Sequence, residues 1–131
     1  MELKKEELHI VLHSLGWSHI RWYEKEKINE KSYRNYFYTN KDTVDYPFIE
    51  SLIDKGIMSI SGKGWDSDSA YFSVTDKGIS CAREHLKGTI KRPSRSKARY
   101  QLYLHCECDE SFGEWLKNSY WDDYRKRYGV S

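Results

Sequence analysis

The sequence lacks the motifs on which most small enzymes depend. It contains no phosphate-binding loop, no Gly-x-Ser-x-Gly nucleophile elbow and no dinucleotide-binding glycine pattern. Gly62-Lys-Gly64 is better explained as turn chemistry. A nucleophilic mechanism needs a base within reach, and only Cys81 with His85, one helical turn away, suggests such a pair. We therefore expect no catalytic residue and no enzyme activity.

Metal-binding spacing is also missing. The three cysteines are Cys81, Cys106 and Cys108, and no two of them form a Cys-x-x-Cys element. His105-Cys-Glu-Cys108 places three soft donors within four residues, but the Cys-x-Cys spacing is too short for both thiols to bind one ion well. We expect free thiols, no metal and no cofactor.

No secretory signal or membrane-spanning run is present. The apolar stretch after Lys4 and Lys5 is short and is interrupted by His9 and His13. An odd number of cysteines without an export signal suits a reducing compartment. The sequence therefore predicts a cytoplasmic protein with no membrane partner.

Global charge excludes no class of partner. The 22 basic and 20 acidic residues leave a net charge of only +2. Locally, Lys87 to Arg99 holds six cations and no acid, whereas the sign reverses between Glu107 and Asp123.

Hydrophobic spacing and turn residues predict an α+β protein. Leu8, Val11, Leu12 and Leu15 indicate a helix over Leu3–Leu15 that ends at Gly16. The following stretch to Thr39 has no clear period, although part of it suits a helix. The remaining expected elements are a helix from Asp45 and Pro47 to Gly56, strands at Ile57–Ser61 and Ala70–Thr75, and a helix capped by Thr75 that ends near Gly88.

The C-terminal region is predicted to be a basic linker followed by helices. Thr89 to Ser96 contains Pro93, and Tyr100, Tyr103 and Leu104 suggest a further helix. Ser111 and Glu114 form a capping box before one last helix extending through Tyr124. We expect residues 1–88 to form a winged-helix-like domain and residues 89–131 to be an extension packed on that same domain.

The order of helix, unclear segment, helix, hairpin and capped helix is that of a winged helix-turn-helix. Phe48-Ile-Glu-Ser-Leu-Ile-Asp-Lys-Gly-Ile-Met58 resembles the third helix and next strand of such domains, and Tyr71-Phe-Ser-Val-Thr-Asp-Lys-Gly78 resembles their second wing strand and closing helix. The longer pattern resembles a group of uncharacterised phage and prophage proteins. Its segments here are Tyr33-Arg-Asn-Tyr-Phe, Asp45-Tyr-Pro, Arg95-Ser-Lys-Ala-Arg-Tyr and Ser111-Phe-Gly-Glu-Trp-Leu116. This resemblance implies a phage or bacterial-host setting and no particular activity.

The usual DNA-binding surface of a winged helix has the wrong sign here. Its third helix offers Glu50, Ser51, Asp54 and Lys55, and its wing adds Asp66 and Asp68 beside Lys63. Carboxylates beside a phosphate backbone are repelled, so standard major-groove binding is disfavoured.

Nucleic acid could still be bound elsewhere. The candidate residues are Lys87, Lys91, Arg92, Arg95, Lys97, Arg99 and Arg34, the last of which lies among tyrosines that could stack on bases. The competing interpretation is that these cations are a solvated face or partners of the acidic segment after Glu107, and that the tyrosines belong to a core or interface.

The C-terminal aromatics suggest a protein interface. The candidates are Phe112, Trp115, Tyr120, Trp121 and Tyr124. They cover either the winged-helix core or the same face of a second copy, which would make a homodimer. Our leading hypothesis is a non-enzymatic phage-type accessory protein that binds a host or phage protein, and the alternative is a nucleic-acid-binding or regulatory protein acting through the basic 87–99 arm.

Overall fold

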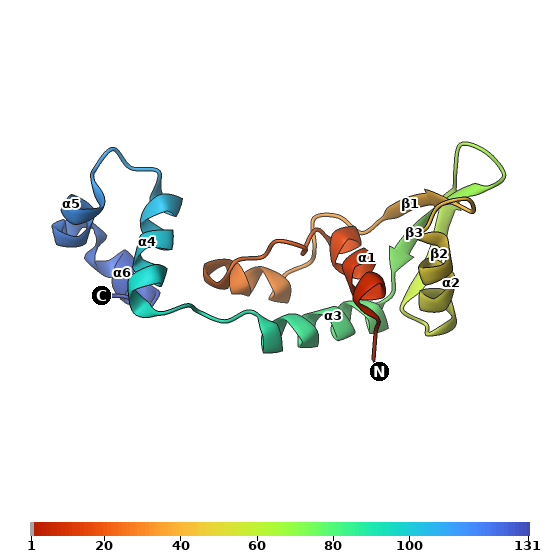
Figure 1. Ribbon diagram of the computed structural model, residues 1–131, viewed down its shortest axis with the longest axis horizontal. Helices are drawn as coiled ribbons and strands as arrows, with labels where there is room; N and C mark the ends of the chain where they lie inside the picture. The colour runs from red at the N-terminus through yellow and green to blue at the C-terminus, as the bar shows by residue number, and fades with distance from the viewer. Residues whose placement is uncertain (1) are drawn as a thin grey trace. The chain divides into compact units, whose positions relative to one another are not determined.

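The computed structural model describes residues 2–131, and the chain divides into two compact units, one ending at Ile90 and one spanning Lys91–Ser131 (Figure 1). The first unit contains α1 (Lys5–Leu15), the 3-10 helix η1 (Trp22–Asn29), β1 (Phe37–Asn40), α2 (Tyr46–Asp54), β2 (Met58–Lys63), β3 (Ser69–Val74) and α3 (Asp76–Thr89). The second contains α4 (Arg95–Cys106), α5 (Phe112–Lys117), the 3-10 turn η2 (Ser119–Trp121) and α6 (Asp122–Arg127). The α+β class is confirmed, whereas packing of residues 89–131 on the first domain stays a prediction.

A three-stranded antiparallel sheet organises the first unit. The strand order is β1-β3-β2, with Met58 opposite Val74 and Tyr38 opposite Tyr71. The expected β2–β3 hairpin is therefore confirmed, with a register shift between Ile60 and Gly62. Strand β1 lies in the stretch whose period was unclear, and it separates η1 from α2 along the chain.

Local signals set the helix ends as expected. Gly16 ends α1 with a φ of 73°, and Gly56 follows α2 with a φ of 74°, both in the left-handed region that a side chain disfavours. The Thr75 hydroxyl accepts the Gly78 N–H at 3.1 Å and so caps α3. No helix in residues 2–131 is long and apolar enough to cross a membrane.

One hydrophobic core joins the helices to the inner face of the sheet. Its buried side chains come from α1, η1, α2, β2, β3, α3 and the turns beside them. They are Ile10, Val11, Leu15, Trp17, Ile28, Ile49, Leu52, Ile57, Met58, Phe72, Val74, Ala82 and Leu86.

The second unit is built around aromatic side chains. The capping box at Ser111 and Glu114 is confirmed, but the single helix expected from Ser111 through Tyr124 is wrong. Helix α5 ends at Lys117 because the Asn118 side chain accepts the Tyr120 N–H at 2.9 Å and starts a new turn. Trp115 is fully buried there.

A buried ion pair connects α1 to α2. The Glu7 side chain has no exposed area, and its oxygens accept from Lys55 Nζ at 2.8 and 3.0 Å. The Lys4 backbone N–H also donates to it at 2.8 Å. Burial raises the pKa of the Glu7 carboxyl, but the hydrogen bonds and charge of Lys55, with the Lys4 and Ser51 contacts, bring the pKa below its usual 4.5.

Replacing Glu7→Gln should lower the free energy of unfolding by about 3 kcal/mol at pH 7, because it breaks a buried, hydrogen-bonded pair. Since the native pKa lies below 4.5, the stabilisation from Glu7 is present above that pH and is lost as the pH falls through the native value. Urea unfolding at pH 7, 4.5 and 3 measures both effects. Glu6→Gln, at an exposed position one residue earlier, is the control, and equal losses in the two variants would contradict the role of the pair.

Gly78 is required by a close approach of α3 to the sheet. A Cβ there would lie 2.4 Å from the Ile57 carbonyl oxygen and 2.5 Å from Val74 Cγ1. Gly78→Ala should therefore destabilise the protein by about 2 kcal/mol through overpacking. Gly88→Ala, also in α3 and with nothing within 4 Å of its Cβ, should be neutral or stabilising, and thermal unfolding of both variants tests this difference.

Candidate binding surfaces

The exposed side of α2 is acidic, as the sequence predicts. Glu50 and Asp54 are exposed, whereas Lys55 is held by the buried Glu7 carboxylate. In the β2–β3 loop, which we refer to as the wing, Asp66 and Asp68 are exposed, and so is Lys63 at the end of β2. The exposed side of α2 and the β2–β3 loop therefore carry mainly carboxylates, which phosphates would repel.

The outer face of the sheet carries an aromatic cluster. Tyr38 on β1 and Tyr71 on β3 are opposite each other, with ring centroids 4.7 Å apart, and Tyr36 contacts Tyr71 at 6.2 Å. Each of the three side chains is between 41% and 46% exposed. We refer to Tyr36, Tyr38 and Tyr71 as the tyrosine face.

Two further residues, Arg34 and Trp65, contact the tyrosine face. The Arg34 guanidinium carbon lies 4.3 Å from the centre of the Tyr36 ring, and Arg34 also donates to the carbonyls of Ser14 and Tyr36 at 3.3 and 3.2 Å. At the wing, the backbone N–H of Trp65 donates to the Tyr38 hydroxyl at 3.0 Å, while Trp65 as a whole is 94% exposed. The backbone of Trp65 is thus attached to the tyrosine face, and its indole is exposed to solvent.

Small neighbours leave the tyrosine rings uncovered. Gly62 is opposite Tyr71 on the β2 side, and Ser59 is opposite Ser73 in the next row of the sheet. A Cβ at Gly62 would come within 3.9 Å of the Tyr71 side chain, so a larger residue there would cover part of this ring.

The predicted nucleic-acid residues are divided between the two units. Arg34 and Lys87 belong to the first unit, where Lys87 lies 3.5 Å from Glu84. The second unit holds the remaining candidates, namely Lys91, Arg92, Arg95, Lys97 and Arg99. Arg92 and Arg99 donate to the carbonyls of Gly129 and Val130, at 2.7 and 2.6 Å, so part of the basic arm holds the C-terminus in place.

Most of the predicted interface aromatics pack inside the second unit. Trp115 has no exposed area, which removes it as a contact residue. Phe112, Trp121 and Tyr124 are half-buried members of one ring network. Only Tyr120, at 79% exposed, offers a large free surface. The spacing that suggested an interface reflects the core of a small helical unit.

The candidates for chemistry are not brought together. All three cysteines are free thiols, and burial raises the pKa of the Cys106 thiol, so this thiol is a weak nucleophile at neutral pH. Between Glu2 and Ser131, no three His, Cys, Asp or Glu side chains are grouped closely enough to hold a metal ion.

No protein-family model, no curated protein and no solved structure matches the chain.

The sequence indicates the tyrosines near Arg34 but not their partners Tyr71 and Trp65. One signal was available, because Tyr36 and Tyr38 alternate with Phe37 and Thr39, which face the core side of β1. β1 and β3 are far apart in the sequence, so no local sequence pattern indicates that they pair.

The hydrogen bond from the Trp65 backbone N–H to the Tyr38 hydroxyl should limit the opening of the wing. Tyr38→Phe removes the hydroxyl that accepts the Trp65 N–H, so this amide should exchange with solvent at least about threefold faster while global stability changes by less than about 1 kcal/mol. Hydrogen exchange followed by NMR measures the effect. Tyr71→Phe is the control, and equal acceleration in both variants would show that the hydroxyl does not hold the wing.

Proposed function

We propose that the protein is a non-enzymatic, phage-type accessory protein whose first unit is a winged-helix scaffold for protein contacts. The order α1, β1, α2, β2, β3, α3 with an exposed β2–β3 loop supports the scaffold. The negative charge of α2 and the wing argues against phosphate contacts at that surface. The resemblance to phage and prophage proteins supports a role in the cytoplasm of a bacterial host.

The observation that carries this proposal is the tyrosine face with Trp65 beside it. Tyr, Trp and Arg are the side chains that most often dominate binding energy at protein interfaces. Here three tyrosines are exposed on one side of the sheet, with half-buried Arg34 against Tyr36 and exposed Trp65 in the β2–β3 loop, and the core on the other side of the sheet contains none of these residues. Large exposed aromatics grouped in this way are typical of interaction sites rather than of inert surface.

The charges around Trp65 indicate the chemistry of the partner. Asp66 and Asp68 follow the indole in the wing, and both are exposed. A complementary partner therefore has an apolar pocket for the indole and a rim of Lys or Arg for the two carboxylates. A second copy of this chain is the alternative occupant, and light scattering of the purified protein distinguishes it.

The test is site-specific photo-cross-linking followed by measured affinity. Trp65→benzoylphenylalanine in phage-infected or host cells should cross-link to one partner, and the same substitution at exposed Glu26 on η1 should not. With that partner purified, Tyr71→Ser should weaken binding at least about tenfold, which corresponds to about 1.4 kcal/mol.

Two exposed tyrosines provide matched controls. Tyr33→Ser, in the same unit but outside the tyrosine face, should leave affinity unchanged, and so should Tyr120→Ser in the second unit. A loss of affinity with Tyr120→Ser but not with Tyr71→Ser would move the interface to the second unit and refute the proposed surface.

A further inference from the structure

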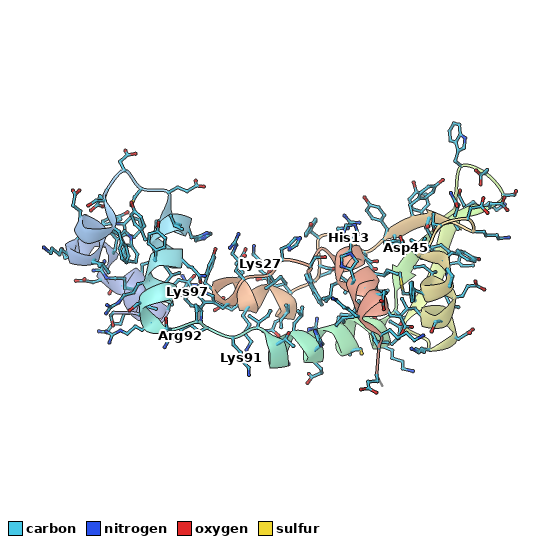
Figure 2. The ribbon with its side chains drawn as sticks, in the orientation of Figure 1. His13, Lys27, Asp45, Lys91, Arg92 and Lys97 are labelled. Atoms are coloured by element: carbon cyan, nitrogen blue, oxygen red, sulfur yellow. The ribbon has the colours of Figure 1, made fainter. Side chains whose placement is uncertain are left out.

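Two stretches that are far apart in the sequence supply exposed cations to the second unit. The first stretch holds Lys91, Arg95 and Lys97, and Figure 2 shows Lys91 and Lys97 on the segment leading into α4 and on its first turn. The second consists of Lys126 and Arg127 at the end of α6. All five side chains are exposed. We call these five residues the split basic patch.

Two arginines hold these stretches together. Arg92 Nη1 donates to the Gly129 carbonyl at 2.7 Å, and the Gly129 N–H bonds back to the Lys126 carbonyl at 3.0 Å. Arg99 Nε donates to the Val130 carbonyl at 2.6 Å. Arg95 lies one helical turn before Arg99 and so shares the side of α4 that holds the C-terminus. Arg92 and Arg99 therefore position the turn that carries Lys126 and Arg127.

No direct ion pair joins this patch to the acidic segment, although Asp122 and Asp123 lie one helical turn before Lys126 and Arg127 on α6. No acidic residue occurs between Glu84 and Glu107. Within the described residues, no ion pair joins any of the five cations to a carboxylate, and Asp122 instead contacts Arg125 at 2.5 Å. The interpretation of the basic arm as the partner of the acidic segment is thus not supported by the contacts.

Arg95 and Lys97 do not stabilise the start of α4, whereas Lys126 and Arg127, in the last turn of α6, lie where cations favour a helix. The first turn of α4 contains Arg95 and Lys97 and no acidic residue, although carboxylates are the side chains that stabilise a helix start. Neighbouring like charges also repel each other. Such an arrangement suits a surface whose charge is compensated by an anionic partner.

We propose that the split basic patch binds the phosphate backbone of nucleic acid without sequence preference, with Lys91, Arg95, Lys97, Lys126 and Arg127 contacting phosphates. Arg92 and Arg99 are positioning residues in this site. The proposal is independent of the protein-binding surface on the first unit. It differs from binding by a linear basic arm because Lys126 and Arg127 are required.

The test is fluorescence-anisotropy titration of the 131-residue protein with single-stranded DNA of 20 random bases and with the matching DNA duplex. Each titration is repeated at several salt concentrations. We expect micromolar binding at low salt, with affinity falling as salt rises. K126Q/R127Q should weaken binding at least about fivefold and reduce the log–log salt slope by about 1 to 2, since each lost phosphate contact removes about 0.7 for a single strand and 0.9 for a duplex. K91Q/R95Q/K97Q should reduce it by about 2 to 3.

A matched control separates this site from general positive charge. K5Q/K31Q/K63Q also removes three exposed lysine charges, all from the first unit, and should leave affinity and slope nearly unchanged. Arg92→Gln should weaken binding and speed hydrogen exchange of residues 126–130, while the five contact residues remain.

Four outcomes would overturn the proposal. The first is no binding even at low salt, and the second is an equal loss of affinity in the control variant. The third is binding to vesicles containing phosphatidylglycerol without binding to either nucleic acid. If K91Q/R95Q/K97Q weakens binding and K126Q/R127Q does not, the site is a linear arm and the two-segment arrangement is refuted.

Discussion

The first unit depends on a buried carboxylate that cannot remain unpaired. Glu7 lies at the start of α1 with no exposed area, and the penalty of burying its charge is offset only because Lys55 and the Lys4 backbone donate to it. Lys55 follows the last residue of α2, so the pair fixes one helix against the other. The Lys55 carbonyl in turn accepts from Lys77 of α3 at 2.9 Å, which extends the same polar contact to the third helix.

This structural pair also sets the sign of a surface. Between Tyr46 and Lys55 the only cation is Lys55, and it is used for the buried pair. The exposed positions Glu50 and Asp54 therefore remain without a neighbouring positive charge on α2. A contact required for folding thus leaves the exposed side of α2 with acidic side chains.

Local chemistry made part of the fold predictable. The hairpin, the glycine helix ends and the Thr75 cap are decided by residues close together in the chain, so the sequence contains their signals. β1 was missed because Tyr36, Tyr38 and their neighbours mix aromatic and polar side chains, and because its partner β3 is distant. The break at Asn118 was missed because apolar spacing continues past it, whereas the side-chain hydrogen bond that ends α5 does not alter that spacing.

The candidate sites were less predictable because composition does not reveal which copies of a residue type are used internally. Trp115 and Tyr120 belong to the same aromatic segment, yet one is fully buried and the other largely exposed. Arg92 and Arg95 likewise belong to one basic run. Arg92 donates to the Gly129 carbonyl, whereas Arg95 lies one helical turn before Arg99, which donates to the Val130 carbonyl. The carbonyls that accept from Arg92 and Arg99 lie more than thirty residues away, so no local pattern could divide the arm into positioning and contact residues. Only the folded second unit makes this division, because it brings the C-terminal turn to α4.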